Sequence, residues 1–452
     1  MTIFILVCSV LFLILVMVRF RYAFFLYIGL LPFMPAYLAI PLGIGGAGIS
    51  LRRIFTYVLL LGIFTTFAKR PRQWLILISL LMTWRAFVLG LIVLYVAKLL
   101  STLMLNELVG LVYWFDEVAE IVVALLLGIK FIDSMQAVRT FFIVVTASFF
   151  LCELTVLVEY AVGHNLLQQL ITVVVSTVGE NVLSGFDRVD VYRTMGLFDN
   201  PLSLSEFVVI STVFSYGAYR LQSLKWLPLL AILLSFSVIY STGSRSGILL
   251  LCVILAMFGY LSFVKNFPSL RLVTRLLSLL ILLGVSYAAY FAINDPHGFV
   301  DATYSLLGGG SYARSTMFRL KQYPLIFSEI FNNPLFGYGV KNQFIQHLKI
   351  TLDSYYLRVL IEGGFIGLSA FLVQVIFVTK FVIFADRSSQ LTTEINKEIY
   401  MFSLLYLASF VGYKFFLSMR YNNIYFYLVC SMLIGFAHRN CIIPSSPKLL
   451  WR

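Results

Sequence analysis

The chain has 452 residues, of which 61% are hydrophobic and 12% charged, and its formal net charge is +13. Soluble domains are about 45–50% apolar and about 25% charged, so this composition excludes a soluble globule, a nucleic-acid-binding domain and a disordered chain. Long apolar runs separated by short basic clusters predict an all-α, polytopic membrane helix bundle. A β-barrel would instead alternate polar and apolar residues along short strands.

Apolar windows predict about 12–13 spans in a single integral-membrane domain that covers residues 1–452. The expected spans are 3–18, 22–40, 53–68, 73–98, 108–129, 140–161, 202–219, 226–241, 246–264, 274–293, 354–383, 399–418 and 422–437. Basic clusters mark the cytoplasmic loops and, from residue 53 onward, alternate with the spans so that the C-terminus lies inside. In the stretch 1–40 two half-length segments either cross separately or insert as one unit.

Two long segments, outer loop 1 (162–201) and outer loop 2 (294–353), fall on the external side by this alternation. Loops of this length are uncommon unless they are functional or disordered, and both keep aromatic and aliphatic residues. In the second loop, the apolar residues of 340–352 share one helical face, which predicts a helix at the membrane surface or over a cavity. We expect both loops to be partly helical and to fold over the outer mouth of the bundle.

Five arginines lie on the expected outer side, where the positive-inside rule predicts few. They are Arg188, Arg193, Arg245, Arg314 and Arg319. The planar guanidinium donates two parallel hydrogen bonds to an oxyanion, so these residues are candidates for binding phosphate. The alternative is that they pair with nearby aspartates or with lipid headgroups. Arg245 is the most informative, because it sits in a short polar break between two apolar spans, and an arginine beside spans usually meets an anion or water.

Asp353 and His347 are the candidate bases. Asp353 precedes the span 354–383, where it is either a helix N-cap or a base that takes a proton from an acceptor hydroxyl. His347 is the secondary candidate. Asp116 and Glu120 share a helix face, which is either a cation or proton site in the membrane or a solvated collar at the end of the span.

The motifs follow one another in a fixed order. Arg193-Thr-Met-Gly-Leu-Phe-Asp-Asn-Pro201 precedes Ser244-Arg-Ser-Gly247, and then come Asn333-Pro-Leu-Phe-Gly-Tyr-Gly339, Asp353-Ser-Tyr-Tyr-Leu357 and Glu362-Gly-Gly-Phe-Ile-Gly367. The third motif predicts a tight turn that lets the backbone approach a partner closely. Together the motifs resemble the O-antigen ligase and Wzy-type polysaccharide polymerase superfamily. Ligases of this superfamily have a histidine where this chain has Asp353, so the resemblance favours the polymerase branch.

The resemblance implies a GT-C-like, metal-independent membrane glycosyltransferase without a cofactor, which transfers glycan from undecaprenyl diphosphate to a hydroxyl acceptor. Carried over, Arg193, Arg245 and Arg314 would bind the diphosphate, with Arg188 and Arg319 as further candidates, and Asp353 would act on the acceptor. The expected location is the bacterial inner membrane, with the active site facing the periplasm or cell exterior. Expected partners are the undecaprenyl-diphosphate-linked glycan and membrane lipids, with a chain-length regulator as a further candidate and no nucleic acid.

Three functions stay open. The favoured one is a repeat-unit polymerase that adds a growing chain to a lipid-linked repeat unit. The second is a ligase that transfers the finished chain to a lipid core or a protein. The third is a flippase or transporter of lipid-linked sugar, whose best support is the set of charges in or near spans: Asp116, Glu120, Glu153 and Lys414.

Overall fold

The fold is known from a computed structural model. It describes residues 2–35, 39–41, 48–105, 108–166, 192–198, 200–221, 225–266, 322, 326–340, 354–387, 394–416 and 422–439. The expected span 274–293 and the expected helix over 341–352 lie outside these residues. So do most of outer loops 1 and 2.

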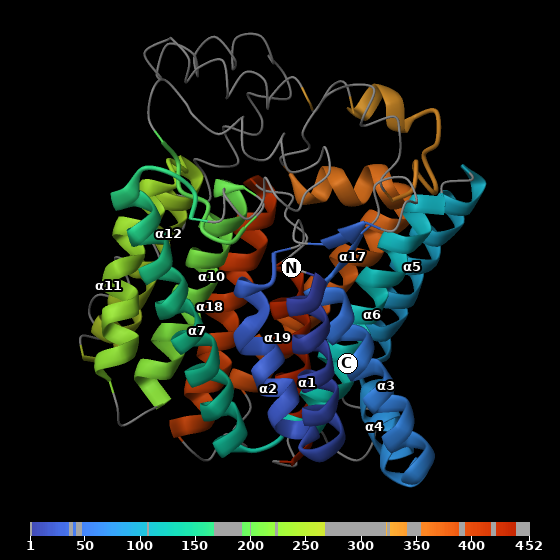
Figure 1. The fold of residues 1–452 in the computed structure, drawn as a ribbon, viewed down its shortest axis with the longest axis horizontal. Coiled ribbons are helices and arrows are strands. Elements are labelled where there is room, and N and C mark those ends of the chain that lie inside the picture. The colour runs from blue at the N-terminus through green and yellow to red at the C-terminus, as the bar shows by residue number, and fades with distance from the viewer. Residues whose placement is uncertain are drawn as a thin grey trace.

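The described residues form an all-α helix bundle, which confirms the predicted fold class (Figure 1). Five helices are long and apolar enough to cross a membrane: α3 (Leu51–Lys69), α5 (Arg85–Met104), α7 (Met135–Val162), α10 (Pro201–Leu221) and α17 (Tyr355–Arg387, apolar through Ile383). The other helices are α1 (Thr2–Val18), α2 (Phe20–Leu30), α4 (Pro71–Thr83), α6 (Leu108–Phe131), α11 (Trp226–Ser241), α12 (Arg245–Asn266), α18 (Glu394–Phe416) and α19 (Asn423–Arg439).

Helix α10 is the centre of the bundle and packs against α7, α11 and α18. Of its most apolar stretch, 89% is buried, whereas 33% of that in α3 is buried. Aromatic rings fill the space around it, with Phe214 in contact with Phe142 and Phe402. We call the end of the bundle where α7 and α11 end and α10, α12 and α17 begin the upper end, as it is drawn in Figure 1.

The N-terminal segments form two helices in contact, α1 and α2, with the break at Arg19. The expected span 22–40 is wrong at its end, because α2 finishes at Leu30 and continues only as the 3₁₀ turn η1 (Leu31–Phe33). Pro32 lies inside that turn, and proline cannot supply the amide that a longer helix would need. A short antiparallel pair follows, β1 (Ala39–Pro41) with β2 (Gly48–Ser50), in which Ile40 pairs with Ile49.

The expected single span over 73–98 is also wrong, because two helices, α4 and α5, meet at Trp84. Trp84 has non-helical backbone angles, φ −96° and ψ 48°, and is 1% exposed. Its indole packs against Phe87, Phe377 and Phe381, so the contacts of a large aromatic ring hold the break in place.

Helix α17 is broken at Gly364, whose φ of 63° lies in the left-handed region. The break folds the start of the helix back onto the rest, since the rings of Tyr355 and Phe371 are 5.3 Å apart. In a straight helix these two positions would be about 24 Å apart along the axis. Figure 1 shows the first part of α17 lying across the upper end.

The turn predicted at 333–339 docks into this break. Tyr338 N donates to Ile361 O at 2.6 Å, Phe365 N to Pro334 O at 2.8 Å, and Ile366 N to Leu335 O at 3.3 Å. Beyond the turn, Val340 N donates to Thr102 Oγ1 of α5 at 3.0 Å. The prediction that glycines allow a close backbone approach here is confirmed, and the partners are α17 and α5.

We expect Gly337→Ala and Gly364→Ala each to lower the stability of the protein by about 2 kcal/mol or more. Both glycines have positive φ, and an added Cβ would overlap the carbonyl oxygen of Ile361 at position 337 or of Leu335 at position 364. Thermal unfolding of the detergent-purified protein measures this. Gly363→Ala is the matched control, because its Cβ would meet its nearest neighbour at 3.6 Å. Equal unfolding temperatures for all three variants would contradict the prediction.

Candidate functional site

Arg193 lies in a segment without regular secondary structure, 192–195, at the upper end of the bundle between α7 and α10. Its side chain is largely buried, and its Nε donates to the carbonyl oxygen of Thr242 at 2.7 Å. The next residue continues the contact: Thr194 N donates to Ser241 O at 3.2 Å, and the two hydroxyls of Thr194 and Ser241 are 2.6 Å apart. The segment is therefore tied to the turn that joins α11 to α12.

That turn carries the second arginine. Gly243 has φ 61°, and a Cβ there would stand 3.1 Å from Arg193 Nε, so glycine leaves room for the arginine side chain. Ser244 caps α12 by accepting a hydrogen bond from Gly247 N at 3.2 Å. Arg245 is then the first residue of α12 and is exposed.

Two arginines that are 52 positions apart in the sequence thus lie on either side of one turn. A helix N-terminus adds its own partial positive charge to theirs. Such an arrangement attracts an anion. Phosphate suits it, because a guanidinium can donate two parallel hydrogen bonds to two phosphate oxygens.

Glu159, near the end of α7, holds the segment that carries Arg193. Its Oε1 accepts hydrogen bonds from the Tyr192 hydroxyl at 2.7 Å and from Met195 N at 3.0 Å. Asn165 adds a bond from its Nδ2 to Gly196 O at 3.2 Å. A buried carboxylate that accepts bonds from both sides of position 193 fixes the path of the backbone there, so Glu159 is a positioning residue for Arg193.

The acidic residues of α6 are paired with basic residues. The Glu120 carboxylate accepts hydrogen bonds from Nε and Nη2 of Arg52, at 2.6 and 2.7 Å. Asp116 forms an ion pair with Arg53 Nη2 at 2.5 Å. Glu117 pairs with Lys98. Asp116 and Glu120 form neither a cation or proton site nor a solvated collar, the two interpretations that the sequence allowed. Both carboxylates form ion pairs with arginines of α3.

Two further ion pairs are fully buried. Lys98 Nζ lies 3.1 Å from Glu362, next to the break in α17, and Lys414 Nζ lies 2.6 Å from Glu206 of α10. Asn422 Nδ2 donates to the same Glu206 at 3.1 Å. These contacts join α5 to α17 and α18 to α10 and α19.

The start of α17 is held as well. The hydroxyl of Tyr355 accepts a bond from Asn423 Nδ2 at 2.9 Å, and Lys414 Nζ lies 4.8 Å from the centre of the Tyr355 ring. Asp353 precedes this anchored residue by two positions in the sequence.

Of the residues predicted from the sequence, the structure describes Arg193 and Arg245, and it places the Arg193 side chain against the turn that precedes Arg245. The remaining five lie outside the described residues: Arg188, Arg314, Arg319, His347 and Asp353. Sequence reasoning missed Glu159, for which a carboxylate inside an apolar run was the available signal. It also missed Arg52 and Arg53, which violate the positive-inside expectation in the same way as the five arginines that were singled out.

We expect Glu159→Ala to loosen the segment 192–196 and to lower stability by about 1–3 kcal/mol, because the buried donors Tyr192 and Met195 lose their acceptor. Hydrogen–deuterium exchange at the Met195 amide, together with thermal unfolding, measures both effects. Glu153→Gln is the control: Glu153 lies on the same helix, is equally buried and has no hydrogen-bond partner in the described part of the chain. Protection of Met195 that survives Glu159→Ala would contradict the positioning role.

The comparison with known families agrees with the motif order. Residues 230–372 match the Wzy_C family model, described as O-Antigen ligase. The matched range contains the turn with Arg245, the turn at 333–339 and the break in α17, while Arg193 lies before it. No curated protein sequence matches the chain. The apolar helices and this family together indicate a membrane protein with activity of the O-antigen ligase or polymerase type. Residues 230–372 are thus similar to the O-antigen ligase family, which supports the superfamily resemblance that the motifs predicted.

Proposed function

We propose that the protein is a repeat-unit polymerase of a bacterial polysaccharide. It transfers the growing glycan from undecaprenyl diphosphate to the hydroxyl of a single lipid-linked repeat unit. The observation that carries the proposal is the pairing of Arg193 with the Thr242 carbonyl, which sets two arginines about the turn that begins α12.

The two arginines suit the charge change in this reaction. As the bond between sugar and phosphate breaks, negative charge grows on the diphosphate that leaves. Positioned donors stabilise a developing anion without having to reorganise during the step. Arg193 donates a hydrogen bond to the Thr242 carbonyl oxygen, and its backbone segment is hydrogen-bonded to Glu159. Its position is therefore set before the substrate binds.

The other candidates have assigned roles in the proposal. Arg314, Arg319 and Arg188 add contacts to the diphosphate of donor or acceptor. Asp353 acts on the acceptor hydroxyl, and His347 is the second candidate for that role. An ordinary aspartate has a pKa of about 4 and is a weak base at neutral pH, so orienting the hydroxyl is the larger part of its task. Tyr355, two positions after Asp353 in the sequence, is anchored by Asn423.

The proposal places the protein in the bacterial inner membrane, with the upper end toward the periplasm or cell exterior. The basic clusters between spans support this orientation. The partners are the undecaprenyl-diphosphate-linked glycan and membrane lipids, with a chain-length regulator as a further candidate. No metal takes part, because arginines carry the role of neutralising phosphate.

A ligase is the second candidate, and the description of the matched family favours it. A ligase would use the same donor and the same arginines but a different acceptor. A lipid-linked sugar transporter is less well supported, because most of the charges in the spans are already paired. Asp116 and Glu120 meet arginines, and Lys414 meets Glu206.

We expect Arg245→Ala and Arg193→Ala to lower glycan transfer about 100-fold or more, since each removes a donor to the developing anion. Arg245→Lys keeps the charge but loses the paired geometry, so it should restore only part of the activity. Arg72→Ala is the control, because Arg72 is an exposed arginine at the start of α4, at the opposite end of the bundle. Purified protein with undecaprenyl-diphosphate-linked repeat units provides the assay. Full activity of Arg245→Ala would rule out its diphosphate role.

The products separate the candidate functions. With lipid-linked repeat units alone, a polymerase yields a ladder of products longer than one repeat. A ligase yields no ladder but transfers glycan once a lipid-core acceptor is added. A transporter yields neither product and moves the lipid-linked sugar across a vesicle membrane. Asp353→Asn should reduce transfer without reducing donor binding, and unchanged transfer would remove Asp353 from the mechanism.

A further inference from the structure

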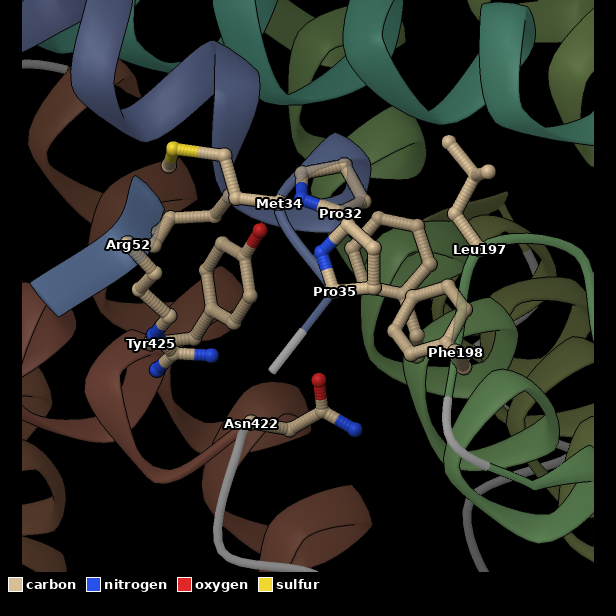
Figure 2. A pocket seen from close by; sticks show the side chains of 10 residues that line it. Pro32, Met34, Pro35, Arg52, Leu197, Phe198, Asn422 and Tyr425 are labelled. Atoms are coloured by element: carbon tan, nitrogen blue, oxygen red, sulfur yellow. The ribbon is translucent and has the colours of Figure 1, made fainter. Parts of the chain in front are cut away.

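Arg52, at the upper end, shows how this bundle balances a buried charge. Figure 2 places Arg52 in the wall of a small pocket, which has room for about one water molecule. Its guanidinium donates hydrogen bonds to Glu120 through Nε and Nη2, so its charge is compensated and no further anion is needed there. At the lower end, opposite the upper end in Figure 1, the arrangement around Lys130 is different.

Lys130 lies in the last turn of α6 and is half-buried among aromatic rings. Its Nζ is 4.3 Å from the centre of the Trp74 ring of α4, 5.6 Å from that of Phe131 and 5.9 Å from that of Phe20. Aromatic faces attract an ammonium but carry no net charge. Among the residues that the structure describes, no carboxylate forms an ion pair with Lys130, and this includes Asp133, three positions later. Its charge is therefore held in place without being compensated.

Arg70 is a second positive charge at the same place. It is the exposed N-cap residue of α4, and its side chain makes no capping hydrogen bond. It precedes Trp74 by about one helical turn and is close enough to Lys130 to repel its ammonium group. The first turn of α4 adds the partial positive charge of a helix N-terminus. We call the place where α6 ends and α4 begins the lower corner, and it lacks a compensating anion in the described part of the chain.

Apolar side chains next to the lower corner are exposed. Phe67 precedes Arg70 by three positions at the end of α3, and Leu75 and Ile76 follow Trp74 on α4. In a membrane these side chains are covered by hydrocarbon chains. A ligand of the lower corner therefore meets positive charge and an apolar surface side by side, and a phospholipid offers a phosphate and acyl chains in the same arrangement.

The charge selects the kind of phospholipid. A zwitterionic headgroup would bring its own cation next to Lys130 and Arg70, whereas an anionic headgroup has a net negative charge to compensate them. The basic clusters predict that the lower end is the cytoplasmic side. Basic pockets between helices on that side of membrane proteins bind anionic headgroups, and each basic residue near the surface contributes to the attraction.

We propose that the lower corner binds the phosphate of an anionic phospholipid from the cytoplasmic leaflet. Lys130 and Arg70 donate hydrogen bonds to the phosphate oxygens, and the acyl chains lie against Phe67, Leu75 and Ile76. The lipid thereby joins α4 to the end of α6. This site is at the opposite end of the bundle from Arg193 and Arg245, and it does not depend on the proposed function.

Lys130→Met tests the site most directly, since it removes the charge and keeps an unbranched side chain among the rings. Arg70→Gln is the second variant, and because Arg70 is exposed its replacement leaves the packing intact. Detergent-purified protein is titrated with phosphatidylglycerol, and native mass spectrometry measures the bound lipid. The affinity should fall about fivefold in each variant, the effect of one basic residue on an anionic lipid. Phosphatidylcholine should bind more weakly, and equally to all forms of the protein.

Lys225→Met is the matched control. Lys225 precedes α11 at the same end of the bundle, and its Nζ is 5.2 Å from the centre of the Tyr219 ring, but it is exposed and lies outside the lower corner. Its phosphatidylglycerol affinity should equal that of the unmodified protein. Equal affinities in all three variants, or equal binding of the two lipids by the unmodified protein, would overturn the proposal. Inorganic phosphate that binds as tightly as phosphatidylglycerol would show a site for a soluble anion and also overturn it. If Lys130→Met does not fold, the affinity of Arg70→Gln decides.

Discussion

An ionised side chain inside hydrocarbon must meet an opposite charge, and this constraint organises the upper half of the bundle. Arg52 and Arg53 of α3 meet Glu120 and Asp116 of α6. Lys98 of α5 meets Glu117 of α6 and Glu362 of α17, and Lys414 of α18 meets Glu206 of α10. Apart from Lys98 with Glu117, which joins the consecutive helices α5 and α6, each pair joins helices that are not neighbours in the sequence. A buried pair adds little net stability, but removal of one partner leaves an uncompensated charge, so the pairs strongly select this arrangement of helices.

The pairing separates two kinds of surface at the upper end. At the turn between α11 and α12, Arg193 donates a hydrogen bond to a carbonyl oxygen and Arg245 is exposed, so this turn carries two positive charges. At the start of α3, by contrast, Arg52 is paired with Glu120, so the two charges compensate each other. The stretch 192–198 connects the two surfaces, and Glu159 holds its first half.

Breaks in helices shape the same region. Gly364 lets α17 fold back, and the turn at 333–339 fills the gap by donating and accepting backbone hydrogen bonds there. Backbone groups freed by a break must be satisfied inside a membrane protein, and here another segment of the same chain satisfies them. Glu362 lies beside the break and meets Lys98, so a charge pair and a backbone contact fix the start of α17 together. Asp353, which acts on the acceptor hydroxyl in the proposed mechanism, precedes the first residue of α17 by two positions in the sequence.

Composition and apolar periodicity were enough to determine the fold class and the approximate positions of most spans, because burial in hydrocarbon requires continuous apolar runs. The order of the motifs was enough to predict the similarity to the O-antigen ligase family that residues 230–372 show. The sequence did not reveal the ends of α2 or the break at Trp84, since ring packing and a proline decided these locally. It also could not show that Arg193 meets the turn before Arg245, or that Asp116 and Glu120 are neutralised by arginines of α3. Those partners lie 49 to 68 positions apart in the chain, and only the packing of the helices brings them within hydrogen-bond distance.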